Sequence, residues 1–332
     1  MIAIYGTIGP GCADRDTLEQ MFAAGMTGMR LNLSHTSLSD SASRIAAYHE
    51  AARAAGVTPE LLIDMQGPEL RIGDLPATVP LSKGEVTVLG GEGIPVPDVI
   101  LPVLQVGDEV LLDDGKISLR VAKHRGWDVL CIVERGGILY GRKSIKLKNP
   151  DAVVELPVLT EHDLNNVRDA AAYGVTGLMQ PFVRSGEELR RVREALAANS
   201  ADHVKIFAKI ENMQGVENLE DILPEADVII IARGDLGNDM DLWQLPAVQK
   251  RIAAACVAHN KPFIVVTQML ASMERSPVPT RAEVSDIFNA VCDGATGVMV
   301  TGETAVGAFP VEVIRYLTNT AEAAVQFLHE KG

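Results

Sequence analysis

Eight short apolar runs recur along the chain, and nearly every one stops at a polar or charged residue. In chain order they read MIAIYGTIGP, GMRLNLSH, ELLIDMQ, GLMQPF, VKIFAKIEN, DVIIIARGD, PFIVVTQ and GVMVTGE. Continuous apolar runs of this length are typical of strands that are buried on both faces of a parallel sheet. If the strands close into a barrel, their polar ends meet at one rim, which is where such barrels carry their chemistry.

Helical patterns separate these runs. The predicted helices span residues 14–24, 37–55, 160–173, 185–199, 244–259 and 311–329. Thr160 and Asp163, at the start of one of them, are spaced as in a capping box. Strands that alternate with helices predict an α/β fold, here a (β/α)8 TIM barrel.

One segment, from about residue 73 to residue 153, breaks this rhythm. It contains the runs VTVLG, EVLLDD, ISLRVAKH and DVLCIVER, with turn signals at residues 114–115 and 135–137. We expect a small all-β domain here, inserted after the third barrel strand and able to act as a lid. The predicted boundaries are 1–70 for the first part of the barrel, 71–153 for the lid and 154–332 for the rest of the barrel.

The formal net charge of −14 over 332 residues restricts the classes of partner. Nucleic-acid binding needs a basic face, so we expect no nucleic-acid partner. No apolar stretch reaches the roughly 20 residues of a membrane span, so we expect no membrane association. Four scattered cysteines without a CxxC pair, and an N-terminus without a signal pattern, indicate a cytoplasmic protein. A homo-oligomer formed through barrel surfaces stays open.

Lysine and two carboxylates gather at the ends of the fifth and sixth runs. Lys209 and Glu211 are two residues apart and therefore share a strand face, and Asp235 ends the next run. Glu211 and Asp235 are then placed to hold one divalent cation, Mg²⁺ or Mn²⁺. The alternative is a salt bridge among these three residues and Arg233, and the spacing alone does not decide between the two.

Other polar groups belong to the same rim: Arg30, Asn32, Ser34, His35, Asp64, Arg71, Thr267 and Thr301. An arginine there matches a phosphoryl oxygen in geometry, or else forms an ion pair. The two threonines either point their hydroxyls into the cavity or cap their strands. His35 either touches a nucleotide or serves as a polar surface or packing residue.

Together these motifs resemble the pyruvate kinase family. The matching stretches, in family order, are residues 7–10, 30–35, 64 with 67–71, 113–115, 209–212, 233–237, 267–270, 272–273, 279–283 and 302–305. They cover essentially the whole chain, and the part from residue 209 to residue 310 is the most specific. The resemblance implies in-line phosphoryl transfer from phosphoenolpyruvate to ADP, which yields pyruvate and ATP.

The resemblance implies a role for each matching catalytic residue. Lys209 would stabilise charge on the transferring phosphoryl group, Arg30 would contact phosphate, and Thr267 would position the enolate or its proton donor. Mg²⁺ (or Mn²⁺) would bind to Glu211 and Asp235. The expected substrate-binding residues are Gly234, Asp235, Thr267 and Thr301.

The resemblance also implies a nucleotide site and a K⁺ site. The expected nucleotide-binding residues are Asn32, His35, Arg71, Asp114 (or its neighbour Asp113) and Lys143. The expected K⁺ ligands are Asn32, Ser34, Asp64 and the backbone carbonyl of Met65. Glu69 matches an acidic position of the K⁺-dependent family members, so we expect K⁺ dependence.

Four residues and one domain depart from the family pattern. Met65 and Gln66 stand where the family has Thr and Lys, Pro181 replaces a Ser, and Ala13 replaces an Arg that contacts nucleotide. The family's C-terminal domain, which carries the sugar-phosphate effector site, has no counterpart in the sequence. We therefore expect no allosteric control of that kind.

These departures leave alternative functions open. One is a related kinase that acts on a pyruvate-like keto acid. Another is a metal-dependent lyase or aldolase that works through a pyruvate enolate, which Ala13 and Pro181 motivate because they weaken the nucleotide side. A third is a non-catalytic sensor of phosphoenolpyruvate or nucleotide, which the presence of Lys209 and Glu211 disfavours.

Overall fold

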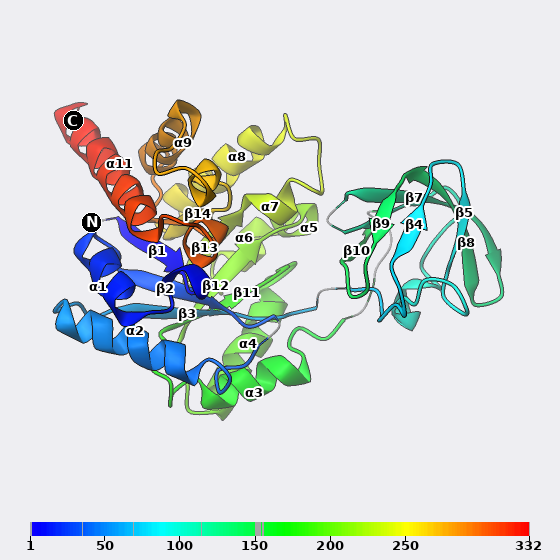
Figure 1. The fold of residues 1–332 in the computed structure, drawn as a ribbon, viewed down its shortest axis with the longest axis horizontal. Coiled ribbons are helices and arrows are strands. Elements are labelled where there is room, and N and C mark those ends of the chain that lie inside the picture. Colours follow the sequence, from blue (N-terminus) through cyan, green and yellow to red (C-terminus); the bar gives the residue numbers. More distant parts are fainter. Residues whose placement is uncertain are drawn as a thin grey trace. The chain divides into compact units, whose positions relative to one another are not determined.

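The computed structural model describes residues 2–34, 36–68, 70–113, 115–149, 154 and 156–331. Within these residues, eight parallel strands close into a barrel in the order β1-β15-β14-β13-β12-β11-β3-β2 (Figure 1). The strands are β1 (Ala3–Thr7), β2 (Gly28–Asn32), β3 (Glu60–Asp64), β11 (Gly177–Gln180), β12 (Lys205–Ile210), β13 (Val228–Ala232), β14 (Phe263–Val266) and β15 (Gly297–Met299). Each predicted apolar run contains one of them, and the (β/α)8 barrel is confirmed.

The side chains of these strands alternate between two apolar layers. On β12, Phe207 belongs to the cluster that fills the barrel, whereas Ile206 and Ala208 belong to the larger core beneath the helices. Because the side-chain period of a strand is two, the next inward position on β12 is Lys209. On β3 the inward residue Leu62 is followed in the same way by Asp64. The strand pattern thus places charged groups directly above an apolar filling.

Helices cover the outside of the barrel (Figure 1). They are α1 (Arg15–Ala23), α2 (Ala42–Ala54), α3 (Glu161–Asp169), α4 (Gly186–Ala198), α5 (Met213–Glu217), α6 (Leu219–Ile222), α7 (Arg233–Leu236), α8 (Leu245–Ala258), α9 (Arg281–Cys292), α10 (Gly302–Ala305) and α11 (Pro310–Lys331). None of the helices in the described part of the chain is long and apolar enough to cross a membrane.

Several helices differ from the sequence prediction: the short helices α5, α6, α7 and α10 were not predicted, and α3 ends at Asp169 rather than at residue 173. Helix α2 begins at Ala42 rather than at Ser37, because the Ser37 amide and hydroxyl both donate to the Asp40 side chain and hold a turn there. Helix α9 was not predicted, although its N-terminus carries a capping box formed by Thr280 and Glu283. The predicted capping box of Thr160 and Asp163 at α3 is confirmed.

Residues 68–157 form a separate compact unit, and residues 1–67 together with 158–332 form the other. Among the described residues of the unit 68–157, an antiparallel sheet has the order β10-β6-β7-β8-β5, and β4 pairs with β9. The strands are β4 (Val79–Leu81), β5 (Val86–Leu89), β6 (Glu109–Leu112), β7 (Ile117–Arg125), β8 (Asp128–Arg135), β9 (Gly137–Leu139) and β10 (Ile145–Lys148). The sequence pattern did not predict the short strands β4, β9 and β10.

Candidate active site

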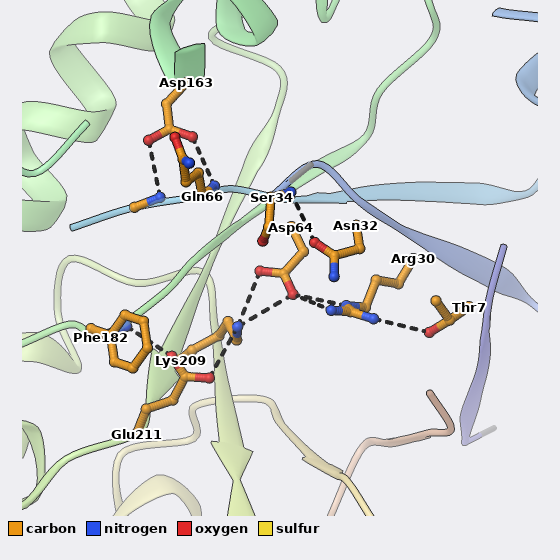
Figure 2. A network of polar contacts seen from close by, with 11 residues as sticks. Thr7, Arg30, Asn32, Ser34, Asp64, Gln66, Asp163, Phe182, Lys209 and Glu211 are labelled. Atoms are coloured by element: carbon orange, nitrogen blue, oxygen red, sulfur yellow. Dashed lines mark hydrogen bonds and ion pairs between the residues drawn. The ribbon is translucent and has the colours of Figure 1, made fainter. Parts of the chain in front are cut away.

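A network of four charged side chains lies at the carboxyl ends of β2, β3 and β12 (Figure 2). Asp64 is 3% exposed and accepts from the Arg30 Nε at 2.8 Å and Nη2 at 2.7 Å. On its other side, the Lys209 Nζ lies 3.1 Å from Asp64 Oδ1 and 3.0 Å from Glu211 Oε1. Two cations and two carboxylates from three strands therefore form one continuous chain of contacts.

The network fixes the charge states of its central members. Burial alone would raise the pKa of Asp64, but Lys209 and Arg30 hold it below its ordinary value, so Asp64 is ionised. Burial alone would lower the pKa of Lys209, but Asp64 and Glu211 raise it above its ordinary value. Lys209 therefore stays a cation at neutral pH although its side chain is almost fully buried.

Glu211 has the most deeply buried side chain of the network. Its side chain is 1% exposed, and its Oε2 accepts the backbone N–H of Phe182 at 2.9 Å. Burial, together with the negative charges of Asp235 and Asp64, raises the pKa of Glu211 to about 7 in spite of the nearby Lys209. The Lys209 contact is possible in either state, because an ammonium donates to a carboxylate or, more weakly, to the carbonyl oxygen of a carboxylic acid.

Asp235 lies within α7, the short helix that follows β13, rather than at the strand end itself. It is close enough for its charge to raise the pKa of Glu211. The four-membered salt bridge considered from the sequence forms only in part. Lys209 does pair with Glu211, but Arg233 turns away to Asp286 and to the backbone carbonyl of Thr267.

Thr267 and Thr301 follow the last two barrel strands and form different hydrogen bonds. The hydroxyl of Thr267 donates to the Val266 carbonyl at 2.5 Å and accepts the Gly234 N–H at 2.8 Å. The Thr301 N–H donates to the buried carboxylate of Glu303 at 2.7 Å, and its hydroxyl lies 3.3 Å from the same oxygen. The structure therefore brings Gly234 and Thr267, two of the predicted substrate-binding residues, into direct contact.

Two of the predicted K⁺ ligands, Asn32 and Asp64, are the last residues of β2 and β3, and the other two lie on the loops that follow. Asn32 Oδ1 accepts the Ser34 N–H at 3.0 Å, and both side chains lie near Asp64 in Figure 2. Met65 is buried and donates its N–H to the Met179 carbonyl. Two residues used in the sequence argument, His35 and Glu69, lie outside the described residues.

Three residues at the start of α3 support these loops and were not identified as site residues. Asp163 is fully buried, and its two carboxylate oxygens accept the backbone N–H groups of Gln66 at 2.8 Å and Gly67 at 3.0 Å (Figure 2). His162 Nε2 lies within hydrogen-bond distance of the Leu33 and Thr36 carbonyls, and Thr160 reaches the Gln66 side chain. The capping box showed where α3 begins, but nothing in its local sequence signals these long-range contacts.

The loop after β3 also shows what one of the unusual residues, Pro181, contacts. Gly67 has a φ of 60°, and a Cβ there would lie 2.3 Å from the Pro181 ring. Only glycine fits this position. Pro181, which replaces the family's serine, therefore packs against the chain just before the inserted unit begins at Pro68.

The predicted nucleotide-binding residues of the inserted unit form ion pairs and hydrogen bonds within that unit. Lys143 Nζ lies 2.8 Å from Asp113 Oδ1, and Lys116 Nζ lies 3.1 Å from Asp113 Oδ2. These contacts keep the pKa of Asp113 below its ordinary value. Arg71 donates to the Arg142 carbonyl at 2.8 Å. Asp114 lies outside the described residues.

Comparison with known proteins identifies the family. Residues 1–314 match the family model described as "Pyruvate kinase, barrel domain". This chain belongs to the pyruvate kinase family. A pyruvate kinase of Geobacillus stearothermophilus is 38% identical over 99% of this chain and 57% of its own length. One of Thermococcus litoralis is 35% identical over 99% of this chain and 70% of its own length.

A solved structure supports the same assignment. The crystal structure of a pyruvate kinase from Cryptosporidium parvum superposes with a TM-score of 0.91 and 32% identity, over 98% of this chain and 69% of that one. The chain thus spans 57% to 70% of the length of these pyruvate kinases.

Proposed function

We propose that this chain transfers a phosphoryl group from phosphoenolpyruvate to ADP, forming pyruvate and ATP. The observation that carries the proposal is the buried network in which Arg30 and Lys209 are held together around Asp64 at the barrel rim. Fixed cations in a buried site stabilise the negative charge that spreads over a transferring phosphoryl group. Membership of the pyruvate kinase family supports the same conclusion.

The residues present fit a divalent cation. The raised pKa of Glu211 reports that burial and the charges of Asp235 and Asp64 outweigh the single positive charge of Lys209. Additional positive charge between Glu211 and Asp235 would relieve that imbalance, and carboxylate oxygens are the donors that Mg²⁺ and Mn²⁺ prefer. Among the described residues there is no group of three or more His, Cys, Asp or Glu that could hold a metal ion by itself, so substrate oxygens and water would complete the shell. When bound, such a cation acts as a Lewis acid on substrate oxygens.

A monovalent cation fits the neighbouring loops. Asn32, Ser34, Asp64 and the Met65 carbonyl offer only oxygen donors, and Asp64 is ionised because Lys209 and Arg30 lower its pKa. Hard oxygen ligands suit K⁺ rather than a transition metal. We therefore include K⁺ dependence in the proposal.

The chain's own residues account for the remaining steps. Arg30 and Lys209 would bind the phosphoryl oxygens while the bond from phosphorus to the enol oxygen breaks and a bond to the terminal ADP oxygen forms. The enolate carbon then takes up one proton to give pyruvate. Thr267, with Gly234 and Thr301 at the adjoining strand ends, would orient the substrate and the proton donor. From the family resemblance alone, we also propose that Asn32, His35, Arg71, Asp114 and Lys143 contact ADP.

A coupled assay of pyruvate formation tests the proposal. We expect turnover that requires phosphoenolpyruvate, ADP and Mg²⁺ together and that rises when K⁺ replaces Na⁺. Absence of turnover at millimolar substrate would reject the proposal. Aldol cleavage accompanied by deuteration of the pyruvate methyl group without any nucleotide would favour the lyase alternative instead.

A further inference from the structure

Thr267 adopts a backbone conformation that its residue type disfavours. Its φ is 76°, and the next residue, Gln268, has a φ of 55°. A β-branched residue in the left-handed region is a genuine outlier, and such outliers persist only where the surrounding structure holds them. The segment that carries the Thr267 hydroxyl therefore needs external support.

Arg233 supplies that support from the adjoining helix α7. Its Nη2 and Nε donate to the Thr267 carbonyl at 2.6 Å and 3.2 Å, so the guanidinium grips the strained peptide with two N–H groups. The same Nη2 lies 2.9 Å from the Met269 sulfur. The side chain of Arg233 is only 11% exposed, which restricts it to this orientation.

Asp286, on α9, holds the other end of the guanidinium. Its Oδ2 lies 2.5 Å from Arg233 Nη1, and its side chain is 34% exposed. A carboxylate that faces a guanidinium fixes the orientation of the planar guanidinium group. This orientation sets the direction of the remaining N–H groups. The contact thus runs from α9 through Arg233 to the Thr267 carbonyl.

The Thr267 hydroxyl is aimed by the same arrangement. It accepts the N–H of Gly234, the residue next to Arg233, and it donates to the Val266 carbonyl. Rotation of the Thr267 peptide would break the carbonyl contact and displace the hydroxyl from Gly234 together. Both ends of Thr267 are therefore tied to α7, and α7 is tied to α9.

We propose that Asp286 and Arg233 are positioning residues that hold the left-handed Thr267 peptide and so aim its hydroxyl at the reacting centre. The proposal rests on the proposed function for its catalytic consequence. Asp286 itself would touch neither substrate nor metal, and its effect would pass entirely through Thr267. Misplacement of a reacting or orienting group by about 1 Å costs on the order of 10²-fold in rate.

Kinetics of Asp286→Ala, Asp286→Asn and Thr267→Ala test the coupling. We expect Asp286→Ala to lower kcat about tenfold or more with little change in the KM for phosphoenolpyruvate. Asn keeps an oxygen for Arg233, so Asp286→Asn should retain most of the activity. In the Thr267→Ala background, Asp286→Ala should have almost no further effect, because groups that act through one another are not additive. The proposal is overturned by unchanged kcat in Asp286→Ala or by full additivity with Thr267→Ala.

Asp293→Ala provides the matched control. Asp293 follows the end of the same helix and pairs with Lys250 at 2.7 Å, so its loss removes a similar ion pair without any contact to Thr267. This variant should keep the kinetics of the unmodified chain. An equal loss of kcat in both variants would mean that α9 acts only through stability, which also overturns the proposal.

Amide exchange at Gly234 gives a readout that does not depend on turnover. The Gly234 N–H donates a hydrogen bond to the Thr267 hydroxyl. The rate of hydrogen exchange at Gly234 therefore reports directly whether this hydroxyl keeps its position. We expect faster exchange at Gly234 in Asp286→Ala and unchanged exchange in Asp293→Ala. An inactive parent chain would refute the proposed function, whereas unchanged Gly234 exchange in Asp286→Ala would refute the positioning role.

Discussion

Strands β3 and β12 each carry two charged residues four positions apart, so the barrel holds one lysine–carboxylate pair at each end. At the amino-terminal end, Lys205 Nζ lies 3.5 Å from Glu60 Oε1, with side chains 57% and 32% exposed. At the carboxyl end, Lys209 lies 3.1 Å from Asp64, with side chains 13% and 4% exposed. Chemistry and strand spacing are nearly the same in the two pairs, and the surroundings differ.

The surroundings decide what each pair can do. The Glu60 carboxylate also accepts the Tyr5 hydroxyl, so the lower pair closes the bottom of the barrel with neutral and solvated partners. The upper pair is joined by Arg30 and Glu211, and burial makes each charge depend on the others. A lysine–carboxylate pair in a barrel thus indicates a functional site only when the pair is buried and other charged residues contact it.

Turnover should separate the two lysines by the largest margin. Lys209→Met removes a fixed cation from the phosphoryl site, and loss of one such group typically costs about 10³-fold in kcat. Lys205→Met removes an exposed cation from the opposite end of the same strand and should stay within about twofold of the parent chain. Steady-state kinetics at saturating phosphoenolpyruvate and ADP measure both. Equal losses in the two variants would show that the comparison concerns folding and not catalysis.

Stability should separate the two carboxylates next. Asp64→Asn leaves the buried Arg30 and Lys209 without their shared counter-charge, and breaking a buried pair in this way costs about 4 kcal/mol. Glu60→Gln keeps an acceptor for Tyr5 and loses a partly exposed pair, so we expect less than about 1 kcal/mol. Urea unfolding of the two variants measures the difference. A loss at Glu60 as large as that at Asp64 would contradict the view that burial distinguishes the pairs.

The sequence predicted that the members of the upper network lie at one rim, because each is local to a strand, but it did not predict the ion pairs of Asp64 with Arg30 and Lys209. Each apolar run fixes the inward face of its strand, so Lys209 and Asp64 follow from the period of two once the barrel is recognised. The strands β4, β9 and β10 were missed because Pro80, Gly137 and the lysines of β10 interrupt the apolar run, whereas β5 and β6, of four residues each, keep one. The barrel was therefore predictable from the sequence, and part of the inserted sheet was not.

Contacts between distant segments could not be predicted in the same way. The ion pair between Arg233 and Asp286 joins residues 53 positions apart on different helices, and no pattern along the chain indicates it. The left-handed conformations of Phe182 and Thr267 also carry no signal, since glycine or asparagine would normally stand there. Each is held by a side chain from a neighbouring strand end, Glu211 for Phe182 and Arg233 for Thr267, which only the closed barrel brings near.

A pH titration of stability should give the smallest separation between the two ends. The position two residues after Lys205 is the buried Phe207, whereas the position two after Lys209 is Glu211, whose pKa is raised to about 7. A carboxyl group with a pKa raised by folding binds more protons in the folded state, so stability rises as pH falls from above 7 toward its unfolded value. In metal-free buffer we expect a gain of about 2 kcal/mol between about pH 8 and about pH 5.5.

Glu211→Gln serves as the reference for this gain, because a neutral amide keeps the shape but cannot titrate. The pH-dependent gain should be present in the parent chain and in Lys205→Met, and it should be missing from Glu211→Gln. Urea unfolding at several pH values measures all three. Identical pH profiles for the parent chain and Glu211→Gln would show that Lys209 fully compensates Glu211, and the upper network would then have no charge imbalance for a divalent cation to relieve.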